Sequence, residues 1–107
     1  AKWKKIQTFF GTTQTDAAYA ALLAEIIPTE NRILVDGFCD RALPVSSYTH
    51  LVKNNGTIDI STGSWKDLFY ELNTQNRHNT INLIYGSFYL VGYIMKMSMN
   101  KYFTSEQ

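Results

Sequence analysis

The chain has very little cysteine, and its positive and negative charges nearly cancel. Its single cysteine, Cys39, cannot form an internal disulfide, whereas small secreted domains usually depend on several. Ten basic and nine acidic side chains give a net charge of +1, too small for the broad positive field of a protein that binds duplex nucleic acid. We therefore expect a cytoplasmic or virion-associated protein, with nucleic acid as a partner that the composition does not favour.

Metal ligands and membrane-spanning segments are also missing. The two histidines, His50 and His78, have no cysteine, histidine or acidic residue three or four positions further on, which is the usual trace of a metal site. No apolar run approaches the roughly 18 to 20 residues that cross a bilayer, and no signal-peptide pattern is present. The sequence predicts no metal, no cofactor and no membrane contact.

The chain does contain enough apolar surface for one folded domain. Apolar residues make up 45% of the 107 positions, and a chain of this length builds one hydrophobic core. We expect a single α+β domain over residues 1–107. Uncharged polar side chains (Asn, Thr, Ser and Gln) are frequent as well, a bias that we associate with proteins of phages and plasmids.

The spacing of apolar residues predicts alternating strands and helices. Strands are predicted at 3–10, 32–38 and 80–85, where β-branched and aromatic residues cluster between turn residues. Capping boxes at 13–16 and 64–67 predict two helices, which end near residues 27 and 75. The apolar face of the first helix is predicted to consist of Tyr19, Leu22, Leu23, Ile26 and Ile27.

Two further patterns favour an antiparallel sheet. Residues 48–53 and 57–61 are predicted to form two further strands, joined at Asn54-Asn55-Gly56, which is typical of a two-residue hairpin turn. Apolar residues alternate over 88–99, which predicts a long final strand. The order βαβββαββ indicates a mostly antiparallel sheet with two helices on one face, such as a ferredoxin-like core with an added hairpin.

The predicted final strand is apolar on both of its faces. Two helices on one side of a sheet leave the other side uncovered, so Phe88, Leu90 and Ile94 are predicted to form a homodimer or partner interface. The alternative is a curled sheet that buries both faces.

Three groups of residues could carry chemistry. Arg77, His78 and Thr80 could provide the cation, acid and base of a metal-independent ribonuclease, or they form a polar turn. In the segment 36–41, the carboxylates of Asp36 and Asp40 at a strand end could hold a proton or a divalent cation, or the segment forms a solvated turn. The loop 11–14 leads into a helix N-terminus and is interpreted first as a helix cap and second as an anion site.

No set of titratable residues converges at the spacing of a known catalytic motif. We therefore predict a non-enzymatic binding, inhibitor or structural protein of phage or plasmid type, which acts by contact with another protein or with a second copy. The alternative is the toxin-type ribonuclease that would use Arg77 and His78.

Overall fold

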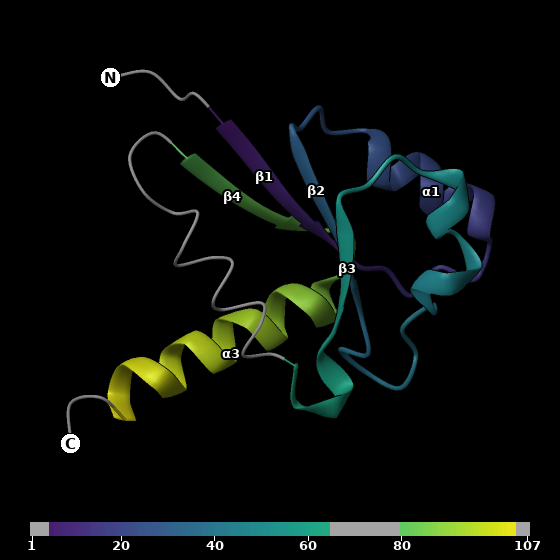
Figure 1. Cartoon of the computed structure of the whole chain (residues 1–107). Helices are drawn as coiled ribbons and strands as arrows, with labels where there is room; N and C mark the ends of the chain where they lie inside the picture. Colours follow the sequence, from purple (N-terminus) through teal and green to yellow (C-terminus); the bar gives the residue numbers. More distant parts are fainter. Residues whose placement is uncertain (1–4, 65–79, 105–107) are drawn as a thin grey trace.

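The described part of the chain forms a four-stranded parallel sheet with helices on both faces (Figure 1). The computed structural model describes residues 5–64 and 80–104. The strands are β1 (Lys5–Phe10), β2 (Asn31–Asp36), β3 (Gly56–Asp59) and β4 (Thr80–Tyr85), in the spatial order β3-β2-β1-β4. Every neighbouring pair runs parallel. The fold is therefore α/β, and the predicted α+β class with a mostly antiparallel, ferredoxin-like sheet is wrong.

Successive residues of the central strands supply two separate cores. Phe9 of β1 packs with β2 residues and with Leu90 and Ile94 of α3 (Phe88–Thr104) on one face of the sheet. Phe10 packs on the other face, with α1 (Ala17–Glu25) and the short helices η1 (Val45–Ser47) and η2 (Thr49–Leu51) nearby. Burial on both faces fits the apolar run Ile33-Leu34-Val35 in β2, as is usual in parallel sheets. In β1 the polar residues Gln7 and Thr8 are buried beside Phe9 and Phe10.

Four predicted strands and the first predicted helix are found, apart from their ends. The runs at 32–38, 57–61 and 80–85 form β2, β3 and β4, and the described part of the run at 3–10 forms β1. Helix α1 begins after Asp16, whose carboxylate accepts a hydrogen bond of 3.1 Å from the Tyr19 backbone N–H, so the cap is Asp16 and not Thr13. The second predicted helix, at 64–75, lies outside the described residues except for Ser64, the last residue of η3 (Ile60–Ser64).

The Asp16 cap leads to a first testable prediction. Substitution Asp16→Ala removes the side-chain acceptor for an otherwise unpaired N–H group, and it should lower the free energy of unfolding by about 1 kcal/mol in urea titrations. Thr15→Ala is the matched control, since Thr15 is exposed and precedes the cap; it should change stability by less than about 0.5 kcal/mol. Equal losses in both variants would contradict the position of the cap.

The predicted hairpin at Asn54-Asn55-Gly56 is wrong. The Asn55 side-chain oxygen accepts from the Arg32 backbone N–H, and the Asn55 backbone N–H donates to the Arg32 carbonyl, both at 2.7 Å. Residue 55 thereby extends the pairing along β2, and β3 begins at Gly56 parallel to β2. Residues 48–53, predicted as a strand, contain η2 instead. The two asparagines position an edge strand and do not reverse the chain.

The predicted strand over 88–99 is also wrong, because these residues belong to α3. Leu90 and Ile94 are four positions apart and therefore share one face of the helix. Both are buried against the sheet, with exposed fractions of 0% and 5%. In Figure 1, α3 begins near the carboxyl end of β4 and runs away from α1, and its residues Leu90 and Ile94 pack on the face of the sheet opposite α1.

Candidate functional site

The chain leaves β1 and β4 toward opposite faces of the sheet. After β1 it enters α1, which packs on the Phe10 side, and after β4 it enters α3, which packs on the Phe9 side. These two strands are neighbours in the sheet. In open α/β sheets, ligands bind in the crevice that such a divergence creates beyond the carboxyl ends of the strands. The candidate ligand site is therefore the place where the loop 11–14 meets residues 86–89.

Two glycines bring the loops of this junction into backbone contact. The Gly11 N–H donates to the Tyr85 carbonyl at 3.3 Å. Gly86 has φ +110°, a conformation that other residues rarely adopt. A Cβ on Gly86 would overlap the Gly11 carbonyl oxygen and come within 2.8 Å of the Phe10 ring. The glycines thus join the two strand ends closely, and they leave no space between the backbones for a phosphate.

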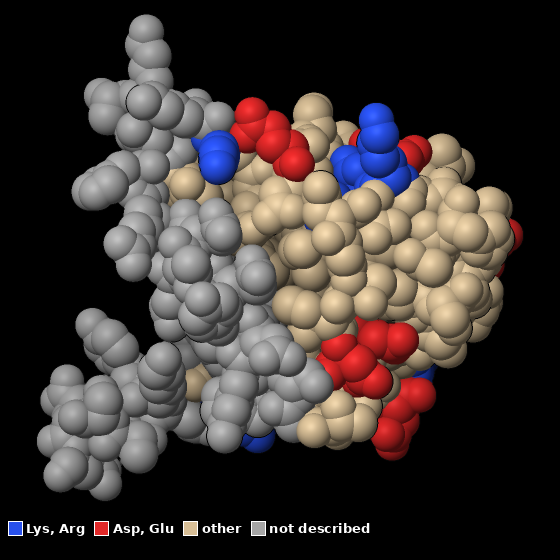
Figure 2. Space-filling view, viewed as in Figure 1, with Lys and Arg blue, Asp and Glu red and all other residues tan. Residues whose placement is uncertain are grey.

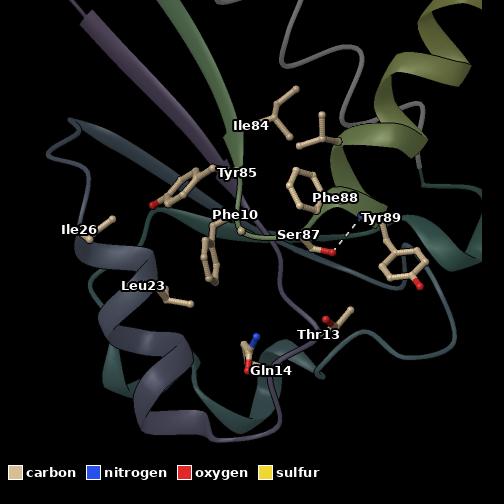
Figure 3. Close-up of a pocket in the computed structure, with 12 residues that line it drawn as sticks. Phe10, Thr13, Gln14, Leu23, Ile26, Ile84, Tyr85, Ser87, Phe88 and Tyr89 are labelled. Carbon is tan, nitrogen blue, oxygen red and sulfur yellow. Dashed lines mark hydrogen bonds between the residues drawn. The ribbon is translucent and has the colours of Figure 1, made fainter.

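A crevice of about 580 Å³ opens beside this junction, between α1, the end of β4 and the start of α3. In Figure 3, Leu23 and Ile26 of α1 stand on one side, Phe10 and Tyr85 lie in the middle, and Phe88 stands on the other side. The lining is mostly apolar and contains no charged side chain; it consists of Phe10, Thr13, Gln14, Leu23, Ile26, Ile84, Tyr85, Gly86, Ser87, Phe88, Tyr89 and Val91. A volume of this size and an apolar lining are typical of small-molecule sites.

Three polar side chains line the crevice, and one of them is already engaged. The Ser87 hydroxyl accepts from the Tyr89 backbone N–H at 3.1 Å, and the Ser87 carbonyl accepts from the Val91 N–H, so Ser87 caps α3. Within the described part of the chain, the Thr13 hydroxyl and the Gln14 side-chain amide have no hydrogen-bond partner. These two groups can donate to or accept from a ligand.

Tyr85 is a fixed wall of the crevice. Its hydroxyl donates to the Ala24 carbonyl at the end of α1, and its ring packs edge-on to Phe10 with 5.0 Å between centroids. Burial raises the pKa of Tyr85, and the nearby Arg32 guanidinium acts in the opposite direction. Arg32 is itself buried and donates to the carbonyls of Ile27 and Lys53 at 3.0 and 2.8 Å. Tyr85 is therefore a phenol whose ring and hydroxyl are both held in place by the protein.

The rim of the crevice exposes large apolar side chains. Ile26 and Phe88 line the crevice with 69% and 94% of their surfaces exposed, and Tyr89 is half exposed. The Arg41 guanidinium lies over the Tyr89 ring at 6.0 Å from its centroid, which is the geometry of a cation–π contact.

The sequence-predicted interface of Phe88, Leu90 and Ile94 does not form one surface. Phe88 is at the rim of the crevice, whereas Leu90 and Ile94 belong to the core under α3. The period-two alternation placed the three on one side, but a helix turns Phe88 away from the other two. Only Phe88 is accessible to a partner.

The predicted ribonuclease set is not brought together by the described residues. Arg77 and His78 lie outside them, and Thr80 begins β4 at the amino edge of the sheet, beside Lys5 of β1. The crevice lies at the opposite edge. Thr80 instead lines a smaller cavity of about 250 Å³, together with Lys5, Ile6, Gln7, Glu30 and Asn31.

Of the two carboxylates at 36–41, Asp36 has structural partners. The Asp36 carboxylate accepts from the backbone N–H groups of Gly37 and Val45, at 2.9 and 3.0 Å, and so closes the loop after β2. At the end of β3, hydrogen bonds from the Ser61 hydroxyl and N–H lower the pKa of the Asp59 carboxyl. Figure 2 shows acidic side chains near these loops, below a broad uncharged area. Among the described residues, no three His, Cys, Asp or Glu side chains gather as metal ligands would.

Sequence reasoning missed the crevice, although two signals for it were present. Gly11 and Gly86 each follow directly after a predicted strand, which is where the loops of an α/β site begin. The loop 11–14 was interpreted as a helix cap or an anion site, but its residues Thr13 and Gln14 form the polar end of an apolar crevice. The signal depends on knowing that β1 and β4 are adjacent and parallel.

Comparison with known proteins gives no relative: no protein-family model, no curated protein and no solved structure matches the chain. Within the described segments, 5–64 and 80–104, no helix has the length and apolarity needed to cross a membrane.

Proposed function

We propose that the protein binds a small, uncharged and largely apolar molecule in the crevice at the carboxyl ends of β1 and β4. The observation that carries this proposal is the coincidence of a cavity of about 580 Å³ with the point where the chain diverges to the two faces of the sheet. No charged side chain lines this crevice, so a charged group inside it would lose its hydration without gaining a counter-ion.

The shape and chemistry of the lining favour a ligand with a flat ring. The rings of Tyr85 and Phe88 lie beside the cavity in Figure 3, whereas the Phe10 ring is fully buried; rings bury large areas against each other in offset or edge-on contacts. Thr13 and Gln14 lie together at one end (Figure 3), where the Gln14 amide offers both a donor and an acceptor. A neutral heteroaromatic ring with one polar edge therefore matches this site best.

The functions predicted from the sequence are only partly kept in this proposal. A non-enzymatic binding role is retained, but contact with a protein through Phe88, Leu90 and Ile94 together is not, because two of these residues are in the core. A ribonuclease that uses Arg77 and His78 stays a hypothesis from the sequence, since no observation on the described residues supports it.

Blocking the crevice tests the proposal. The half-buried Val91 lines the crevice, and Val91→Trp should fill it and weaken the binding of neutral ring probes (indole, quinoline, nicotinamide) by at least about tenfold. Ligand-observed NMR titration measures the dissociation constants. Leu51→Trp is the control, because Leu51 is exposed on η2 and does not line the crevice. Equal affinities for both variants, or no binding to the unmodified protein at about 1 mM probe, would contradict the proposal.

A further inference from the structure

Helix α1 is apolar on two sides, and only one side is covered by the rest of the protein. Its small residues, Ala20, Ala21 and Ala24, are buried against the sheet. Three large residues point outward: Tyr19, Leu22 and the C-cap residue Ile26 are 49%, 68% and 69% exposed. We call these three residues the α1 strip. A helix that is apolar all round normally has cover on all sides.

The three residues of the strip lie on one face of the helix. They are three and four positions apart, the spacing at which side chains align along an α-helix. From Tyr19 to Ile26 the strip is about 10 Å long, or two helical turns. Side chains with this spacing form the ridges that interdigitate when two helices pack against each other. The geometry therefore suits a second helix lying along α1.

Acidic residues lie at both ends of the strip, and they favour a partner helix with basic residues. Asp16 caps the first turn of α1 and Glu25 is its last residue, and both are exposed. The Glu25 carboxylate accepts from the Lys53 backbone N–H at 3.1 Å, which orients it but does not neutralise it. A second copy packed through the same strip would place acidic residues against acidic residues, which is unfavourable.

We propose that the α1 strip binds an amphipathic helix of a partner protein, with lysine or arginine residues flanking the apolar face of that helix. The apolar face of the partner helix covers Tyr19, Leu22 and Ile26. Its basic residues pair with the carboxylates at the two ends of α1. This surface overlaps the proposed ligand site at Ile26, whereas Tyr19 and Leu22 do not line the crevice.

A designed peptide provides a direct test. The probe is a fluorescein-labelled helical peptide with leucines at positions i, i+3 and i+7 and two lysines at each end. Fluorescence anisotropy should give a dissociation constant of about 10 to 100 µM with the unmodified protein. Leu22→Asp should weaken binding by at least about tenfold, whereas Leu51→Asp, a change at another exposed leucine, should not affect it. Circular dichroism checks that both variants are folded.

Three results would overturn the proposal. The first is no binding at about 100 µM protein. The second is equal binding by a peptide in which glutamates replace the lysines, since the charge argument would then be wrong. The third is a dimer in sedimentation equilibrium that Leu22→Asp dissociates, because a second copy would then cover the strip. The Val91→Trp variant should bind the peptide normally, which distinguishes a failure here from a failure of the ligand site.

Discussion

Replacing Gly86 by alanine is expected to lower the free energy of unfolding by about 3 kcal/mol or more. Residue 86 has φ +110°, which costs a residue with a side chain about 1 to 3 kcal/mol. The new methyl group would also overlap the Gly11 carbonyl oxygen, and that atom belongs to the backbone and cannot rotate away. Separating the two loops would break the Gly11–Tyr85 hydrogen bond and distort the crevice. Urea-induced unfolding followed by circular dichroism measures the effect.

Gly92→Ala is the matched control for this substitution. Gly92 lies inside α3, its φ is not positive, and a Cβ there would meet nothing within 4 Å. Alanine should therefore stabilise the protein by about 0.5 to 1 kcal/mol, the difference in helix propensity. If both variants were as stable as the unmodified protein, the close junction of β1 and β4 would be incorrect.

The second large effect is expected at Leu90. This side chain is fully buried between α3 and the sheet, so Leu90→Ala removes apolar contacts and leaves a cavity, at a cost of about 2 to 5 kcal/mol. Phe88→Ala, two residues earlier, should change stability by less than about 0.5 kcal/mol, because 94% of Phe88 is exposed. Thermal and urea unfolding of the two variants give the comparison.

The contrast between these two variants distinguishes the helix from the strand predicted over 88–99. In that strand, Phe88 and Leu90 would share one face and respond alike. Similar stability changes, or a smaller assembly after substitution of Leu90 in a protein that stays folded, would support the strand and its interface. A large loss at Leu90 alone supports α3 packed on the sheet.

The positions of the central strands could be predicted from the sequence, but residues 88–99 fitted both a strand and a helix. β1 contains β-branched and aromatic residues and stops at Gly11, and β2 contains the apolar run Ile33-Leu34-Val35; such signals are recognisable without knowledge of the neighbouring strands. Over 88–99 the same residues satisfy a period of two and the i, i+4, i+7 pattern of Leu90, Ile94 and Met97. The length of this apolar segment favoured a helix, because most strands have only about 5 to 6 residues.

The parallel topology depended on connections that the local patterns did not reveal. Parallel neighbours need a crossover of about a dozen residues or more, and the connections 11–30 and 37–55 are both long enough. The Asn-Gly pair suggested a hairpin instead, but Asn55 forms its hydrogen bonds with Arg32. Those bonds join residues far apart in the sequence, and no local pattern encodes them.

The candidate site could not be predicted from the sequence either, because it depends on how α1 and the strands pack together. Large apolar residues on α1 were expected to face the core, but the alanines permit a closer approach to the sheet, so Tyr19 and Leu22 remain outside. The crevice collects side chains from β1, α1, β4 and α3. Its existence follows from the strand order, and the strand order could not be obtained from composition or spacing.

The central claim, that the crevice is the binding site, is tested most directly by an amide chemical-shift map during titration with indole. The largest shifts are expected at Gln14, Gly86 and Ser87, which line the crevice. The amide chemical shifts of Glu30 and Thr80, at the smaller cavity on the opposite edge of the sheet, should not change. Shifts concentrated at Glu30 and Thr80, or spread evenly over the protein, would contradict the claim.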